Sequence, residues 1–180
     1  CSVTHPFGSD YYNYRFVCRE SPKALNGVPY QTHIYSFDAK AKNNNVEPYL
    51  VLIDYFPQNI MAFKFCREVD RGTDREYTHM SNTYDAGRKI ATCLQIVKEL
   101  ADENPRATFA WVGARGDFDY SNRSTKRFRV WYRLSKKWFN PAKWRIRPFK
   151  EESACLIVRN GVYSDEEVKE IYSIANKVLT

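Results

Sequence analysis

The residue types best suited to chemistry are concentrated in one basic segment, from Tyr120 to Lys150. It holds eleven Lys or Arg residues and no Asp or Glu, and seven aromatic side chains follow Tyr120. The net charge of the whole chain is +7, so the remaining residues sum to −4 and the positive charge is local. Cations contact phosphates, and aromatic rings stack on bases. The segment therefore predicts a nucleic acid or another polyanion as partner.

The candidate contact residues are the cations and one indole that the 123–150 surface can present to solvent. They are Arg123, Lys126, Arg129, Arg133, Lys136, Lys137, Lys143, Trp144, Arg145 and Arg147. No helix-turn-helix or zinc-finger pattern is present, so structured RNA or single strands fit better than a duplex read by sequence. The alternative is a solvated helix face that pairs with acidic residues elsewhere, including Glu151, Glu152 and the Asp165-Glu166-Glu167 run.

The spacing of histidines, cysteines and carboxylates predicts no metal centre. The three His residues are isolated, without HxH or HExxH spacing. Asp54, Glu68 and Asp70 lie on or beside a predicted strand hairpin, which leaves a metal-dependent nuclease open as a third function. Lys64, however, precedes Glu68, whereas the usual nuclease core has its lysine two residues after the acid.

The cysteine pattern favours reduced thiols and a cytoplasmic location. The five cysteines are scattered and form no CxxC pair. Cys18, Cys66, Cys93 and Cys155 lie in apolar segments and are predicted to pack in the core. A lipidated Cys1 is one interpretation of the start, and removal of an initiator Met is the simpler one. No apolar run approaches the roughly 20 residues that cross a bilayer, so we expect no membrane partner.

The first half of the chain predicts strands. Tyr12 to Arg19 and Tyr30 to Asp38 are rich in aromatic and β-branched residues and are expected to pair. Tyr49 to Phe56 and Ile60 to Glu68 are expected to form a hairpin through Pro57-Gln58-Asn59. The polar stretch 69–80 predicts an exposed loop.

The second half alternates helices with strands. Apolar residues at three- and four-residue spacing predict a helix from about Tyr84 to Glu103, followed by a buried strand from Thr108 to Ala114. A basic helix is expected from about Thr125 to Phe139. Strands at Trp144 to Phe149 and Ser153 to Arg159 precede a last helix, Asp165 to Leu179, which Ser164 and Glu167 open as a capping box. The order predicts one α+β domain over residues 1–180, with a mixed, mostly antiparallel sheet flanked by helices.

This order of elements resembles the GNAT N-acetyltransferase superfamily over about Tyr49 to Arg159. The nearest local match runs from Asn122 through Tyr132 to Trp138-Phe139. The resemblance implies a GNAT-like sheet and Tyr132 as the catalytic general acid toward the coenzyme A thiolate. It also implies that Thr83, Gly87 and Arg88, at the start of the long helix, would hold the pyrophosphate of acetyl-CoA.

The segment Ser81 to Lys89 has a single glycine where that family has a Gly-x-Gly loop. We therefore expect mainly a basic binding module without a cofactor. The alternative is an acetyl-CoA-dependent N-acyltransferase acting on an RNA-linked or acidic substrate. A fainter likeness, to uncharacterised bacterial and phage proteins in which a similar Ser-Asn-Thr turn opens such a helix, implies no activity.

Overall fold

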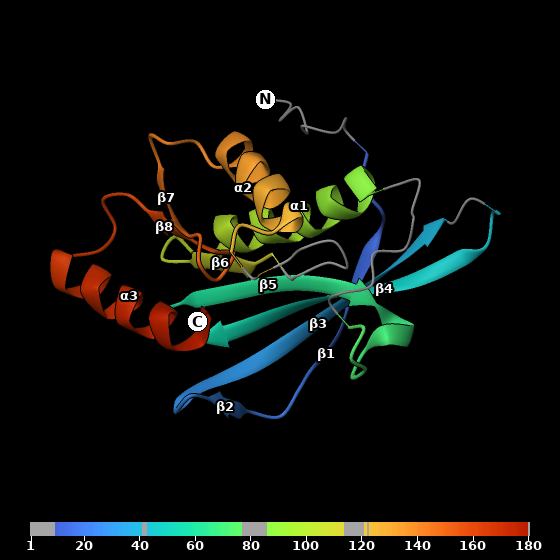
Figure 1. Ribbon diagram of the computed structural model, residues 1–180, viewed down its shortest axis with the longest axis horizontal. Helices are drawn as coiled ribbons and strands as arrows, with labels where there is room; N and C mark the ends of the chain where they lie inside the picture. The colour runs from blue at the N-terminus through green and yellow to red at the C-terminus, as the bar shows by residue number, and fades with distance from the viewer. Residues whose placement is uncertain (1–9, 41–42, 77–85, 114–120, 122, 180) are drawn as a thin grey trace.

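A mixed β-sheet with helices on both faces forms the frame of the molecule (Figure 1). The computed structural model describes residues 10–40, 43–76, 86–113, 121 and 123–179. Within these ranges the strands are β1 (Tyr14–Arg19), β2 (Lys23–Leu25), β3 (Val28–Lys40), β4 (Val46–Phe56), β5 (Ile60–Arg67), β6 (Thr108–Val112), β7 (Trp144–Phe149) and β8 (Ala154–Arg159). The helices are α1 (Ala86–Glu103), α2 (Lys126–Trp138), α3 (Asp165–Leu179) and the 3₁₀ turn η1 (Glu68–Asp70).

The predicted strand pairing and the predicted hairpin are both confirmed. β1 pairs with β3 and β4 pairs with β5, all antiparallel. The stretch between β1 and β3 also holds the short strand β2, which pairs with β3 across Asn26 and Gly27. Both residues have positive φ, 49° and 78°, as a two-residue hairpin turn requires. Gln58 and Asn59 turn the β4–β5 hairpin in the same left-handed region.

One parallel seam joins two antiparallel parts of the sheet. The strand order is β1-β3-β4-β5-β6-β8-β7, and β5 and β6 are parallel while every other described neighbour pair is antiparallel. Only Ile60, Met61 and Ala62 of β5 have partners in β6. The α+β class and the mixed, mostly antiparallel sheet are therefore confirmed.

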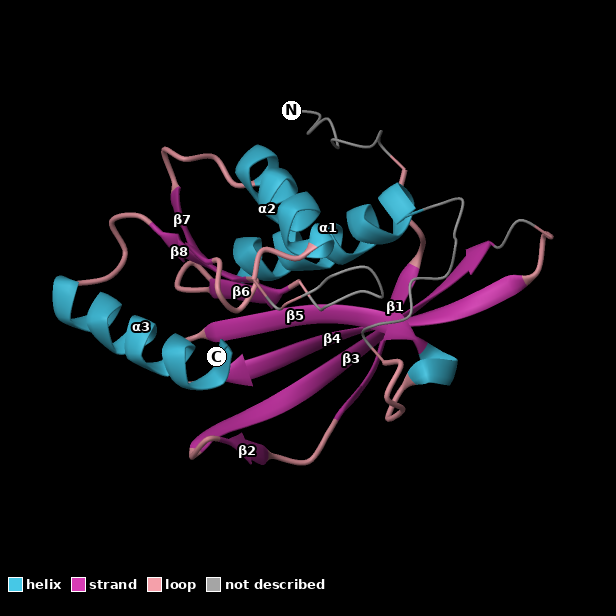
Figure 2. Cartoon of the chain, viewed as in Figure 1, coloured by secondary structure: helices cyan, strands magenta, loops and turns pink. Residues whose placement is uncertain are grey.

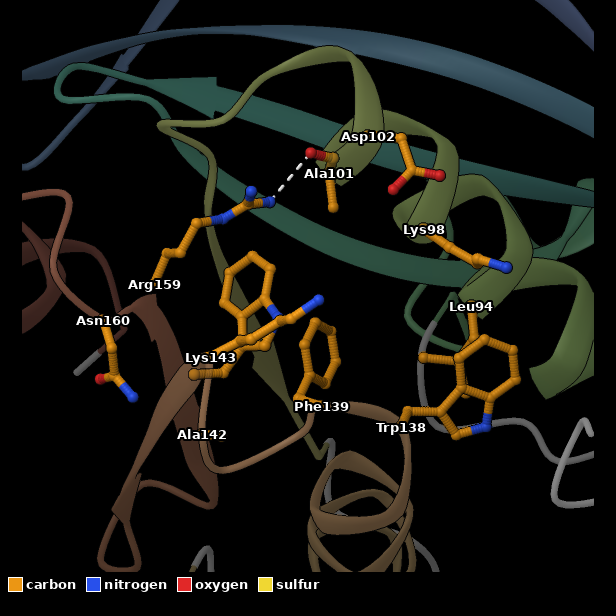
Figure 3. Close-up of a pocket in the computed structure, with 11 residues that line it drawn as sticks. Leu94, Lys98, Ala101, Asp102, Trp138, Phe139, Ala142, Lys143, Arg159 and Asn160 are labelled. Atoms are coloured by element: carbon orange, nitrogen blue, oxygen red, sulfur yellow. Dashed lines mark hydrogen bonds between the residues drawn. The ribbon is translucent and has the colours of Figure 1, made fainter. Parts of the chain in front are cut away.

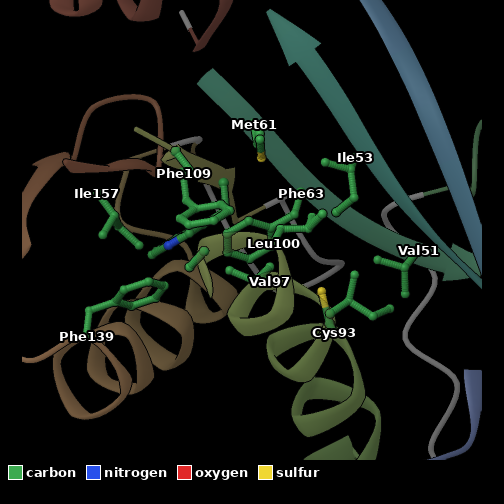
Figure 4. Close-up of a cluster of buried hydrophobic side chains, with 14 of the residues drawn as sticks. Val51, Ile53, Met61, Phe63, Cys93, Val97, Leu100, Phe109, Phe139 and Ile157 are labelled. Atoms are coloured by element: carbon green, nitrogen blue, oxygen red, sulfur yellow. The ribbon is translucent and has the colours of Figure 1, made fainter. Parts of the chain in front are cut away.

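The two faces of the sheet have separate cores. α1 and α2 lie together over one face (Figure 2), where Val97 and Leu100 of α1 pack with Phe63 and Phe109 of the sheet (Figure 4). α3 covers the other face, and its Ile171 packs in a cluster that includes Leu156 and Val158 of β8. Alternate residues of β8 thus belong to different cores.

The amino end of α2 is fastened to the sheet by buried hydrogen bonds. Thr125 caps the helix, because its hydroxyl oxygen accepts from the backbone N–H of Phe128 at 3.1 Å. The same hydroxyl donates to the carbonyl oxygen of Gly113 at 2.6 Å, and the Thr125 N–H donates to the hydroxyl of Ser153 at 2.8 Å. These bonds set where the first turn of the basic helix lies.

A second polar contact holds the middle of α2. Ser135 is fully buried, and the Trp111 indole N–H donates to its hydroxyl at 3.0 Å. Trp111 also contacts Phe128 and Trp131, with ring centroids 5.5 and 6.2 Å away. The Trp111–Ser135 hydrogen bond, together with the aromatic contacts around it, therefore fixes the position of the buried side of α2 on β6.

Replacing Ser135 with Ala should destabilise the fold by about 1–3 kcal/mol, since the buried Trp111 N–H would lose its acceptor. Urea unfolding measures the change in the free energy of unfolding. Ser173→Ala, at an exposed position of α3, is the matched control and should change it by less than about 0.5 kcal/mol. Equal effects of the two substitutions would show that the Trp111 contact contributes nothing.

The cysteine prediction is confirmed for three residues and wrong for one. Cys66, Cys93 and Cys155 are buried, whereas Cys18 is exposed on the edge strand β1. A bulge between Phe16 and Cys18 interrupts the pairing with β3 there. Burial raises the pKa of the Cys66 thiol to about 11 and that of Cys155 to about 12, so both thiols stay protonated and unreactive.

The remaining helix predictions hold with small differences. α1 begins at Ala86, and the predicted residues before it lie outside the described ranges. Ser164 and Glu167 form the predicted capping box, with reciprocal bonds of 3.2 Å at the start of α3. The predicted loop after β5 begins with η1, in which Asp70 is buried. Of the described helices, none is long and apolar enough to span a bilayer.

Candidate nucleic-acid interface

The cations of α2 occupy its solvent-facing side. Lys126, Arg129, Arg133, Lys136 and Lys137 are all exposed. The opposite side of the helix packs on the sheet through buried or half-buried residues, which include the aromatic side chains predicted for the core. The helix contains no acidic residue. The sequence prediction of an amphipathic basic helix is confirmed.

Four of these five cations have no acidic neighbour among the described residues. Among the described residues, no carboxylate lies within 4.0 Å of the side-chain nitrogens of Arg129, Arg133, Lys136 or Lys137. Arg129 instead donates to the carbonyl oxygen of Ser124 at 2.5 Å. The ammonium of Lys136 lies 4.6 Å from the centre of the Tyr132 ring.

The acidic residues expected to pair with the basic segment lie mostly elsewhere. Glu151 does pair with Arg123, at 3.2 Å between exposed side chains. Glu167 belongs to α3 and pairs with Arg106. The pKa of its carboxyl is lowered, mainly by a hydrogen bond from the Ser164 backbone N–H and less by the Ser164 hydroxyl and Arg106. Pairing with the acidic residues elsewhere therefore accounts for Arg123, but among the described residues it does not account for Arg129, Arg133, Lys136 and Lys137.

Strand β7 divides the predicted surface between the two faces of the sheet. Arg145 and Arg147 stand opposite Val158 and Leu156 of β8, which belong to the α3 core. The Arg147 guanidinium lies 4.3 Å from the ring centre of Tyr172 on α3. Both arginines therefore project away from α2, although their strand runs close to it.

Trp144 is on the same face as α2 but contributes to the core. Its ring lies 5.2 Å from that of Phe139 and 5.9 Å from that of Phe109, measured between centroids. Lys143, which precedes it, is exposed. Of the residues in and around β7, Lys143 and the accessible part of Trp144 are thus the ones that extend the α2 surface.

A pocket of about 410 Å³ lies at the carboxyl ends of α1 and α2. Its charged lining comprises Lys98, Lys143 and Arg159, with Asp102 as the one carboxylate. In Figure 3, Arg159 and Asn160 lie on one side of the pocket and Lys98 on the other, with Lys143 between them. The lining carries more positive than negative charge and is an extension of the basic surface.

The aromatic wall of the pocket is formed by Trp138, Phe139 and Trp144. Arg159 braces this wall, because its guanidinium lies 4.5 Å from the Trp144 ring centre and Nη2 donates to the carbonyl oxygen of Ala101 at 2.9 Å. Its Nε is buried without a hydrogen-bond acceptor among the described residues. The pocket thus offers ring surfaces beside cations.

Another group of rings, of which Phe16 is exposed and Tyr14 and Tyr35 are half-buried, lies on β1 and β3 near Glu99 and Glu103. Phe16 and Tyr14 contact Tyr35 at centroid distances of 5.5 and 6.3 Å. Burial, together with a hydrogen bond to Glu99, raises the pKa of the Tyr14 hydroxyl, and Glu103 contributes after burial to the raised pKa of Tyr35. Carboxylates beside these rings disfavour phosphate, so the α2 surface fits a nucleic acid better.

The residues implied by the acetyltransferase resemblance do not meet at the described pocket. Tyr132 is half-buried on α2, stacked on Phe128 at 5.6 Å, and does not line it. Arg88, at the opposite end of α1, pairs with Asp10 at 3.4 Å and lies over the ring of Tyr12. Gly87 adjoins it in the first turn, and Thr83 lies outside the described residues.

Two of the three carboxylates of the nuclease alternative, Asp54 and Asp70, are engaged in structural contacts, whereas Glu68 is exposed. Asp54 accepts a hydrogen bond from Thr32 at 2.6 Å and pairs with Lys64 at 3.2 Å. Asp70 receives two bonds from Arg67, of 2.7 and 3.1 Å. Within the described part of the chain, no three His, Cys, Asp or Glu side chains are grouped so as to hold a metal ion.

Comparison with known proteins finds no matching family model, curated protein or solved structure. The surface of the protein is therefore the basis from which its function is inferred. Sequence reasoning missed Lys98, Arg159 and Asn160 as neighbours of the basic segment. The one available signal was weak: Lys98 and Asp102 are four residues apart and share the exposed side of α1.

Proposed function

We propose that this protein binds single-stranded or structured nucleic acid through the exposed face of α2, extended by Lys143. The observation that carries the proposal is the group of four exposed α2 cations, Arg129, Arg133, Lys136 and Lys137, that pair with no carboxylate among the described residues. Exposed charges held this close together repel one another, and a polyanion would relieve that repulsion while releasing its own counterions.

The geometry suits a flexible phosphate backbone. Arg129, Arg133 and Lys137 recur every four residues, so they form a row with about 6 Å between neighbours along the helix axis. The row leads toward the carboxyl end of α2, where Trp138 and Trp144 line the pocket. Phosphate contacts followed by ring surfaces are the usual combination for single strands.

Free thiols at the described cysteines support the accompanying proposal of a cytoplasmic location.

Fluorescence anisotropy with a labelled single-stranded RNA tests the proposal. Affinity should fall as salt rises, with a slope of log K against log salt of roughly −2 to −3 for three or four neutralised phosphates. The absence of binding at low salt would refute the proposal, as would an affinity that salt does not change.

A second candidate is the acetyl-CoA-dependent N-acyltransferase. Its support is the element order β4, β5, α1, β6, α2, β7, β8, with Tyr132 on α2 as the resemblance implies. Of the residues that would hold the coenzyme, Arg88 is already paired with Asp10, which fits a pyrophosphate site poorly. A rise in melting temperature with acetyl-CoA, and activity lost in Tyr132→Phe, would favour this candidate over simple binding.

A further inference from the structure

We propose that the pocket at the carboxyl ends of α1 and α2 holds one nucleotide unit of a bound strand. In this assignment the base lies against the aromatic wall and the phosphate is held by Lys98 and Lys143. The inference rests on the proposed nucleic-acid binding and adds a defined subsite to it.

The charge of the lining selects an anion. Lys98 is half-buried and Lys143 is exposed, and neither has a carboxylate within 4.0 Å among the residues that the structure describes. Asp102 is exposed beside them. Two ammonium groups from different elements therefore line the same pocket, and a phosphate accepts several charge-assisted hydrogen bonds.

The aromatic wall selects a ligand that also has a flat ring. Phe139 and Trp144 meet edge to face, with ring planes at 79°, and Arg159 holds Trp144 in place through its guanidinium. Trp138 completes the aromatic wall beside Phe139 (Figure 3). Base stacking on such rings requires no particular sequence, because every base has a π-face.

Size and position agree with a single nucleotide. The volume of about 410 Å³ lies near the lower end of the range for small-ligand pockets, roughly 300–1,000 Å³. Lys136 and Lys137 in the last turn of α2 immediately precede Trp138 and Phe139, which line the pocket. A strand that follows the cations of α2 toward the carboxyl end of the helix would therefore approach the pocket.

Tryptophan fluorescence of the full chain, titrated with AMP, tests the subsite because Trp138 and Trp144 line it. We expect saturable quenching and a Kd at least about 10-fold weaker in the double variant Lys98→Ala, Lys143→Ala. Ala142→Trp, an exposed lining position, should weaken binding by filling the pocket. Lys169→Ala on α3 should leave the Kd unchanged. The absence of saturable quenching, or an unchanged Kd in the double variant, would overturn the proposal.

Repeating the titration with an RNA of about 10 nucleotides, a length within the usual site size of single-strand-binding proteins, shows whether the pocket binds a nucleotide of a strand or a free nucleotide. If the double variant weakens RNA and AMP alike, the pocket takes a unit of the strand. If it weakens AMP alone, the ligand is a free nucleotide and the strand assignment is overturned. If RNA does not bind even at low salt, the proposed function fails, whereas the AMP result still decides whether the pocket accepts a nucleotide.

Discussion

Reversing three cations of α2 together, by Arg129→Glu, Arg133→Glu and Lys137→Glu, should weaken binding to single-stranded RNA by at least about 100-fold at low salt. Each change removes one phosphate contact and adds a repulsive charge in its place. The three side chains are exposed and pair with no described carboxylate, so their replacement leaves the core intact. Anisotropy at two salt concentrations measures the loss, and circular dichroism verifies the fold.

The control places the same charge change on other elements. Lys23→Glu, Lys169→Glu and Lys177→Glu alter β2 and α3, where the three lysines are exposed. This variant should retain most of the affinity, because contacts near the bound backbone contribute far more than screened charges beyond about 10 Å. Equal losses in the two triple variants would mean that the chain attracts RNA by net charge alone, and the α2 interface would be wrong.

Gly113→Ala should be among the most destabilising single substitutions, at about 1–3 kcal/mol and toward the upper end of that range. A Cβ at Gly113 would lie 2.5 Å from the backbone nitrogen of Phe128 and 2.6 Å from its Cα. Those atoms belong to the first turn of α2, which the Thr125 cap fixes against β6. The helix must shift, so RNA affinity should also fall. Urea unfolding and anisotropy on the same sample measure both effects.

Gly72→Ala provides the comparison. No atom lies within 4 Å of a Cβ built there, but the residue has φ of +76°. Its cost should therefore be only the left-handed backbone strain of about 1–2 kcal/mol, without loss of RNA affinity. If Gly113→Ala cost no more than Gly72→Ala and left binding intact, the close approach of α2 to Gly113 would not matter for the interface.

The secondary structure was largely predictable because its signals are local. The capping box at Ser164 and Glu167 and the turn residues between β4 and β5 are specified within a few positions. The exposure of Cys18 was not predictable in this way. Its segment is apolar, but it forms an edge strand with a bulge, and edge position depends on the order of all the strands.

The candidate site was predictable only in part for the same reason. The alternation of Trp144 and Ile146 with Arg145 and Arg147 is visible in the sequence. Which set shares a face with α2 depends on the register of β7 on β8. The pocket is less predictable still, because Lys98 comes from α1 and its partners come from segments about 40 to 60 residues later.

The parallel contact between β5 and β6 is short, so the packing of α1 across both strands helps to hold the two parts of the sheet together. Three residue pairs link the strands, and the paired residues are far apart in the chain. Bringing β5 and β6 together closes a long loop, and the entropy this costs is only partly offset by three residue pairs. Val97 and Leu100 of α1 pack in the core that holds both Phe63 of β5 and Phe109 of β6. Loosening α1 would therefore weaken the junction between the β1–β5 half and the half that carries the basic helix, and Trp131 of α2, which contacts both Phe63 of β5 and Trp111 of β6, would be left to hold the two together.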